Sequence, residues 1–183
     1  MSHFIVQVEH FTTADEFRDH LNKHNPSVAD WAKGIVLHHT WLPTIDTWRG
    51  LPTLNGIVGY YKNKGWTTGP HLFIAKGSRN PDDDGIWQMT PLNVPGTHAA
   101  AYNRSHWGIE VVGNYDIAPW PDPTKQLVYD TVAALCKWKG ISVTRSTLLG
   151  HRETGSQKTC PGKKINMDSV RADLIQIQKE GTM

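Results

Sequence analysis

The chain has 183 residues, of which 38% are hydrophobic and 20% charged, and its formal net charge is +2. This composition is typical of one globular domain with a sizeable core, and it excludes disordered and collagen-like chains. Because lysines and arginines are scattered and the net charge is small, nothing indicates a nucleic-acid partner. The two cysteines, Cys136 and Cys160, are too few for a disulfide framework.

The amino terminus does not predict secretion, and no segment predicts a membrane span. The first ten residues contain no basic stretch followed by a long apolar stretch, so they do not resemble a signal peptide. No apolar run approaches the roughly 20 residues that a membrane-spanning helix needs. We therefore expect a monomer that is made in the cytoplasm and has no stable membrane association.

The first half of the chain predicts two helices and three strands. Thr13 is a good N-terminal cap for the first helix, and Leu54, Ile57, Val58 and Tyr61 have helical spacing in the second. The predicted helices cover residues 13–23 and 53–64, and the predicted strands cover residues 34–37, 70–75 and 86–89.

The second half adds one strand and two helices. The strand covers residues 107–112, one helix runs from Pro123 to a stop at Gly140, and Asp168 caps the last helix. Helices separated by strands predict an α/β fold with a central mixed β-sheet flanked by helices. We expect a single domain over residues 1–183, with its core at about 30–165.

Possible metal ligands occur at three places. His38 and His39 end the apolar strand, His151 follows Gly150, and Cys160 lies in a short loop. Zinc in catalytic sites takes three nitrogen, sulfur or oxygen ligands from the protein and leaves one position for water. Since side chains alternate across a strand, only one of the two adjacent histidines can face the metal.

Glu110 is an ionisable residue in an otherwise apolar strand. It shares one face of the strand with Gly108 and Val112, while Trp107, Ile109 and Val111 share the other face. Burying a lone carboxylate costs several kcal/mol, roughly, unless it is paired or neutralised. Glu110 is therefore either exposed or ion-paired, or it is a general acid or base beside the metal.

Four segments of the chain, taken in sequence order, resemble the corresponding segments of one enzyme family. Residues 37–40, 107–110, 150–153 and 158–162 are similar to those of the zinc-dependent N-acetylmuramoyl-L-alanine amidases of type 2. The family includes phage endolysins of the T7 lysozyme type, bacterial cell-wall amidases and peptidoglycan recognition proteins. The resemblance covers roughly residues 30–165, and its most specific part is the spacing from His151 to Cys160 with Lys158 two residues before the cysteine.

The resemblance implies a fold of the amidase and peptidoglycan recognition protein type and a site with one Zn²⁺ per chain. Its implied metal ligands are His38, His151 and Cys160. Lys158 then polarises the scissile carbonyl or holds the oxyanion, and Glu110 acts on the attacking water. T7-type members have a catalytic tyrosine where this chain has Pro70, so a tyrosine-dependent route looks closed.

Other residues are candidates for contact with the substrate. His98 and Asn103 lie in a loop of small residues, and Trp41, Trp48 and Trp66 lie in polar loops where they can stack on sugar rings or line a peptide groove. We expect a structural or supporting role for His71. The remaining histidines, including His106, are expected to be solvated.

The function that the resemblance implies is hydrolysis of the amide bond between N-acetylmuramic acid and L-alanine in peptidoglycan or its muropeptide fragments. A one-domain phage or prophage endolysin, bacteriolytic after release through a holin, fits the missing signal peptide. A cytoplasmic muropeptide-recycling amidase fits equally well. Two other hypotheses are a non-catalytic peptidoglycan-binding module and a structural zinc site, which would need His39 or His71 as a fourth ligand.

Overall fold

A computed structural model describes residues 3–181. One mixed sheet of six strands forms its centre, in the order β1-β4-β3-β5-β2-β6. The strands are β1 (Glu9–Phe11), β2 (Gly34–His39), β3 (Leu72–Ala75), β4 (Gly85–Gln88), β5 (His106–Val111) and β6 (Leu148–Gly150). The helices are α1 (Ala14–Asn22), α2 (Leu51–Asn63), α3 (Asp122–Lys139) and α4 (Met167–Lys179). The predicted α/β fold is confirmed.

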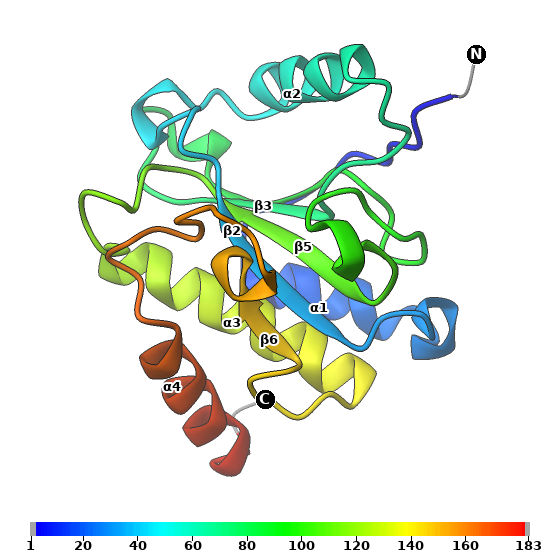
Figure 1. The fold of residues 1–183 in the computed structure, drawn as a ribbon, viewed down its shortest axis with the longest axis vertical. Helices are drawn as coiled ribbons and strands as arrows, with labels where there is room; N and C mark the ends of the chain where they lie inside the picture. Colours follow the sequence, from blue (N-terminus) through cyan, green and yellow to red (C-terminus); the bar gives the residue numbers. More distant parts are fainter. Residues whose placement is uncertain (1–2, 182–183) are drawn as a thin grey trace.

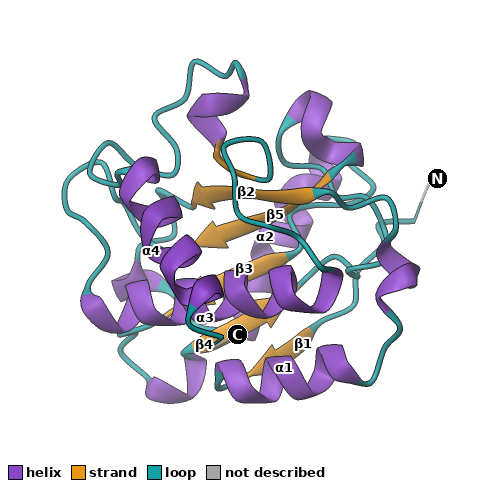
Figure 2. Ribbon diagram, turned by 90° about the horizontal axis from the view of Figure 1, so that it is seen from below, coloured by secondary structure: helices purple, strands orange, loops and turns teal. Residues whose placement is uncertain are grey.

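The parallel part of the sheet sets the position of the site. Strands β3, β5, β2 and β6 are paired in parallel, whereas β4 runs antiparallel to both β3 and the edge strand β1. Figure 2 shows β2, β5, β3, β4 and β1 in succession. His38 lies opposite Glu110, and Leu37 lies opposite Gly150. Because the carboxyl ends of parallel strands meet at one edge, Glu110, His38 and the residue after Gly150 come together there.

The two faces of the sheet are covered differently. Helices α1 and α3 cover one face, where Phe17 and Val132 join the larger apolar core. Helix α2 lies over the other face, as Figure 1 shows, and buries Leu54 and Val58 against Phe73 of β3. Trp107, Ile109 and Val111 of β5 are buried on the side of α1 and α3. Because side chains alternate along a strand, Glu110 lies on the opposite face, which is the α2 side.

Local signals explain most helix boundaries. Thr13 caps α1 by accepting a hydrogen bond from the backbone N–H of Glu16, and α3 ends at Gly140 with φ of 69°, a left-handed conformation that favours glycine. The predicted cap of the last helix was wrong. Asn166 caps α4 by accepting from the N–H groups of Asp168 and Ser169, which places Asp168 in the first turn.

Two short strands and two burial states differ from the sequence predictions. Strands β1 and β6 were missed because three residues are too few to show a periodicity. Trp48 is fully buried, so it cannot stack on a sugar ring, and His106 is 5% exposed rather than solvated. Within residues 3–181, every helix is too short or too polar to cross a membrane.

Candidate metal centre

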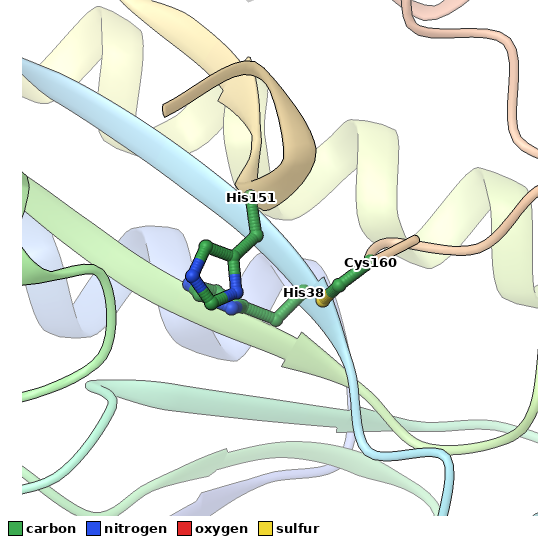
Figure 3. Close-up of side chains that lie close together, drawn as sticks. All are labelled: His38, His151 and Cys160. Carbon is green, nitrogen blue, oxygen red and sulfur yellow. The ribbon is translucent and has the colours of Figure 1, made fainter. Parts of the chain in front are cut away.

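Three side chains from separate segments converge at the carboxyl edge of the sheet. His38 ends β2, His151 begins a short 3-10 helix directly after β6, and Cys160 lies in the following loop. Their donor atoms all lie within 4.8 Å of one another, and Figure 3 shows the three side chains gathered at the β2 ribbon. Two imidazole nitrogens and one sulfur this close together are a donor set that suits zinc.

His39 supports the centre from the other side of the strand. Its ring Nδ1 accepts a hydrogen bond from the backbone N–H of Tyr115 at 3.0 Å, and its own backbone N–H lies 3.1 Å from Sγ of Cys160, to which it donates. His71 is also engaged elsewhere, since its ring bonds the carbonyl of Val94 and the N–H of Gly108. Among the described residues, neither histidine joins the three donors as a fourth ligand.

The protonation of the two histidines suits a metal ion, whereas the cysteine has a proton to lose. Burial, with neighbouring His98 and His151, holds the pKa of His38 well below its ordinary value, and burial together with Lys158 lowers the pKa of His151. Both rings are therefore neutral and can offer a lone pair. Burial raises the pKa of the Cys160 thiol, and the nearby carboxylate of Glu110 adds to this rise. A bound cation would displace the thiol proton, as metal binding to cysteine requires.

Glu110 is a largely buried carboxylate that forms no ion pair with a lysine or arginine of the described part of the chain. Its side chain is 12% exposed, and Oε1 lies 4.0 Å from Nδ1 of His38. Within residues 3–181, its Oε2 has no hydrogen-bond partner. Burial raises the pKa of Glu110 to about 8, although the charge of Lys158 opposes this rise. The carboxyl group of Glu110 is thus available to exchange a proton with a molecule bound beside it.

A cavity of about 660 Å³ opens over the three donors. Glu110, Lys158 and Pro70 contribute to its wall, so Pro70 does occupy a position that faces the site. A second cavity of about 670 Å³ continues from Glu110 and Lys158 along α2. The centre therefore lies in a long cleft rather than in a closed pocket.

The candidate substrate residues are not all in this cleft. Trp41, which is 54% exposed, lines the first cavity together with Trp66 and His98. Asn103 is not part of that lining. Its Oδ1 instead accepts hydrogen bonds from the backbone N–H groups of His98 and Ala99. Asn103 shapes the loop on which His98 stands.

Tyr61 and Lys64 are among the residues of the cleft wall that sequence analysis missed. Tyr61, which was assigned only to the apolar face of a helix, lines both cavities and stacks on Trp66 with ring centroids 4.7 Å apart. Lys64 also lines both cavities, and its Nζ lies 5.4 Å from the Trp66 ring centroid. Burial and the nearby charge of Glu110 raise the pKa of Tyr61, so this phenol remains a neutral hydrogen-bond donor. The sequence did contain one signal for this part of the cleft wall, since Tyr61 and Lys64 lie close in the chain to Trp66, a candidate substrate residue.

Arg152 fastens the loop that carries Cys160. Its guanidinium donates to the carbonyls of Thr159, Gly162 and Ile165, and its backbone N–H donates to the carbonyl of Cys160 at 2.9 Å. These bonds tie the loop to the residue next to His151. Two of the three ligands are thereby held in a common frame.

Replacing Arg152 with alanine is expected to weaken metal binding by about 10–100-fold, the usual cost of losing a group that orients a ligand. Lysine should not restore it, because a single ammonium cannot bond three separated carbonyls. Chelator competition would measure the metal dissociation constant. Arg145→Ala is the control, since Arg145 is an exposed partner of Asp168. Equal affinity in Arg152→Ala and the control would contradict the role of Arg152.

Comparison with known proteins decides the family. The family model described as N-acetylmuramoyl-L-alanine amidase matches residues 28–163. The chain belongs to this amidase family. All three converging donors, Glu110 and Lys158 lie within the matched segment.

Individual relatives agree with this assignment. Peptidoglycan-recognition protein SC2 of Drosophila melanogaster is 30% identical over 145 residues, which cover 76% of this chain and 73% of that protein. The structure of an endolysin from a Thermus scotoductus bacteriophage has a TM-score of 0.59 and 26% identity, and the match covers 79% of this chain and 84% of that one. A Drosophila PGRP-LB mutant in complex with tracheal cytotoxin has a TM-score of 0.64 at 21% identity, covering 91% and 86% of the two chains. The last similarity concerns the fold alone.

Proposed function

We propose that this protein is a zinc-dependent enzyme that hydrolyses the amide bond between N-acetylmuramic acid and L-alanine in peptidoglycan. The observation that carries the proposal is the convergence of His38, His151 and Cys160, with Oε1 of Glu110 located 4.0 Å from His38 and its Oε2 without a hydrogen-bond partner among the described residues. Family membership supports the reaction. The donor set supports zinc, which prefers nitrogen and sulfur ligands and takes three of them in catalytic sites.

His38, His151 and Cys160 would hold the zinc ion, one per chain. When bound, zinc polarises a carbonyl group and makes a water molecule acidic enough to lose a proton near neutral pH. The positive charge of the ion also favours the ionised form of Glu110, because an opposite charge nearby lowers the pKa of a carboxyl group.

Glu110 and Lys158 would carry out the proton transfer and charge stabilisation. Glu110 accepts a proton from the attacking water and delivers it to the amine that leaves with the peptide. Lys158 lies in the wall of both cavities and can donate a hydrogen bond to the carbonyl oxygen as negative charge develops there. Such a donor contributes about 2.7–4 kcal/mol in comparable hydrolases.

The length and lining of the cleft suit a substrate that has both sugar rings and a peptide. Trp41 and Trp66 provide aromatic faces on which sugar rings can stack, and the second cavity along α2 has room for a peptide. We propose that the enzyme acts as an endolysin on intact wall, as the phage protein it resembles is named. A recycling amidase would instead act on soluble muropeptides, and a recognition module would bind without cleavage.

Mass spectrometry of purified peptidoglycan separates these functions. The protein would be tested untreated, after EDTA, and after EDTA followed by zinc, with Glu110→Gln as a zinc-loaded inactive control. Stem peptides that begin with L-alanine, lost with EDTA and recovered with zinc, are the expected result. Binding without cleavage would overturn the enzymatic proposal, and cleavage at sugar or stem-peptide bonds would overturn the reaction. Cleavage of soluble muropeptides but not of intact wall would favour recycling.

A further inference from the structure

His98 connects His38 to the backbone on the far side of the centre. Nδ1 of His98 lies 3.0 Å from Nε2 of His38, with the two rings nearly perpendicular at 87°. Nε2 of His98 lies 2.9 Å from the carbonyl oxygen of His106. Both ring nitrogens of His98 are therefore engaged within the protein, which leaves neither one free for a substrate.

The carbonyl of His106 fixes the direction of both hydrogen bonds, from His38 to His98 and from His98 to His106. A carbonyl oxygen only accepts, so Nε2 of His98 carries the proton and donates to His106. A neutral imidazole has one N–H, so Nδ1 of His98 is an acceptor, and Nε2 of His38 must donate to it. The lone pair of His38 is then on Nδ1, the nitrogen that faces Glu110.

The position of the His98 ring is built into the surrounding structure. A Cβ at Gly108 would lie 2.4 Å from Cγ of His98, so glycine on β5 leaves the space that the ring fills. Asn103 holds the His98 backbone by accepting its N–H at 2.9 Å. The contact with His38 is thus made by a ring that is fixed on two sides.

We propose that His98 is a positioning residue that accepts the Nε2 proton of His38 and so presents the Nδ1 lone pair of His38 to the metal. This inference rests on the proposed zinc site. Hydrogen bonds to the second nitrogen of a metal-binding histidine set its tautomer and orientation, and their loss commonly weakens metal binding 10–100-fold.

Three substitutions of His98 separate this role from simple packing. In His98→Asn the amide oxygen takes the position of Nδ1 and can still accept from His38. In His98→Gln the amide nitrogen reaches toward His106 while the acceptor for His38 is lost, and His98→Leu lacks both groups. Chelator competition for zinc, the visible spectrum of bound Co²⁺ and thermal unfolding of the metal-free protein would be measured for each.

The zinc dissociation constant should rise about 10–100-fold in His98→Gln and His98→Leu and stay close to wild type in His98→Asn. The Co²⁺ spectrum should change in His98→Gln and His98→Leu but not in His98→Asn. His106→Gln is the matched control, because its ring bonds Ser105 and Ser146 and not a ligand, while its carbonyl remains. Wild-type affinity in His98→Gln, or equal losses in the Asn and Gln variants, would overturn the inference. Absence of zinc binding in the wild type would instead overturn the proposed function.

Discussion

Replacing Glu110 with glutamine is expected to reduce turnover by about 10²–10⁴-fold, the usual contribution of a general acid or base. Zinc should remain bound, because Glu110 is not one of the three converging donors. Release of L-alanine peptides from peptidoglycan and zinc content would be measured on the same preparation. Normal turnover in a zinc-loaded variant would contradict the assignment of Glu110.

The same substitution should stabilise the metal-free fold at high pH. Burial raises the pKa of Glu110 from 4.5 to about 8 in the folded protein. Between these two pH values the Glu110 carboxyl group is ionised in the unfolded protein and protonated in the folded protein. The free energy of unfolding therefore falls as pH rises and becomes level above pH 8. Glutamine does not ionise and avoids this loss, which amounts to a few kcal/mol as an order of magnitude, at about 1.36 kcal/mol per pKa unit.

Urea unfolding of both metal-free proteins at pH 5 and pH 9 would measure this effect. All other titrating groups are shared, so the difference between the two proteins isolates Glu110. We expect the advantage of the glutamine variant to grow from pH 5 to pH 9. A difference that does not change with pH would show that the folded state does not disfavour the carboxylate.

Replacing Cys160 with serine is expected to remove zinc and activity together. A hydroxyl group does not supply the thiolate that zinc prefers, and two histidines alone leave the ligand set incomplete. At a free zinc concentration of 1,000 times the dissociation constant, bound zinc stabilises the folded state by about 4.1 kcal/mol. The variant should therefore unfold in the presence of zinc at the temperature found for wild-type protein treated with EDTA.

Cys136→Ser is the matched control for this prediction. Cys136 is 2% exposed on α3, is part of the larger core and is not one of the three converging donors. Serine there should lower the stability of the metal-free protein while zinc content and turnover persist. Full zinc content and activity in Cys160→Ser would show that the ligand set is wrong.

Local sequence was sufficient for much of the fold, and the resemblance to the amidases supplied the three donors. The cap at Thr13 and the stop at Gly140 depend on neighbouring backbone groups, so residue type alone predicts them. The convergence of His38, His151 and Cys160 was also predicted, since the motifs around these residues are short and distinctive. The cap of α4 was misplaced by two residues because Asn166 and Asp168 are both good caps, and packing selects between them.

Other properties depend on contacts between distant segments. Alternation along β2 requires that one of two adjacent histidines face the metal, but only the position of β6 and the Cys160 loop decides for His38. The burial of Trp48 results from its packing against Phe73, and the burial of His106 from its bond to Ser146. Polar neighbours in the chain do not reveal either contact.

The sequence by itself determined the fold class, the main helices and the chemical types that meet at the centre, because these follow from hydrophobic periodicity, caps and compact motifs. Only the tertiary structure decided that Oε2 of Glu110 has no hydrogen-bond partner within residues 3–181, that Tyr61 lines the cleft and that His98 bonds His38. The last contact joins residues separated by 60 positions, and Glu110 owes its raised pKa to burial by several segments. Protonation and orientation depend on the three-dimensional surroundings of a group, which no local pattern contains.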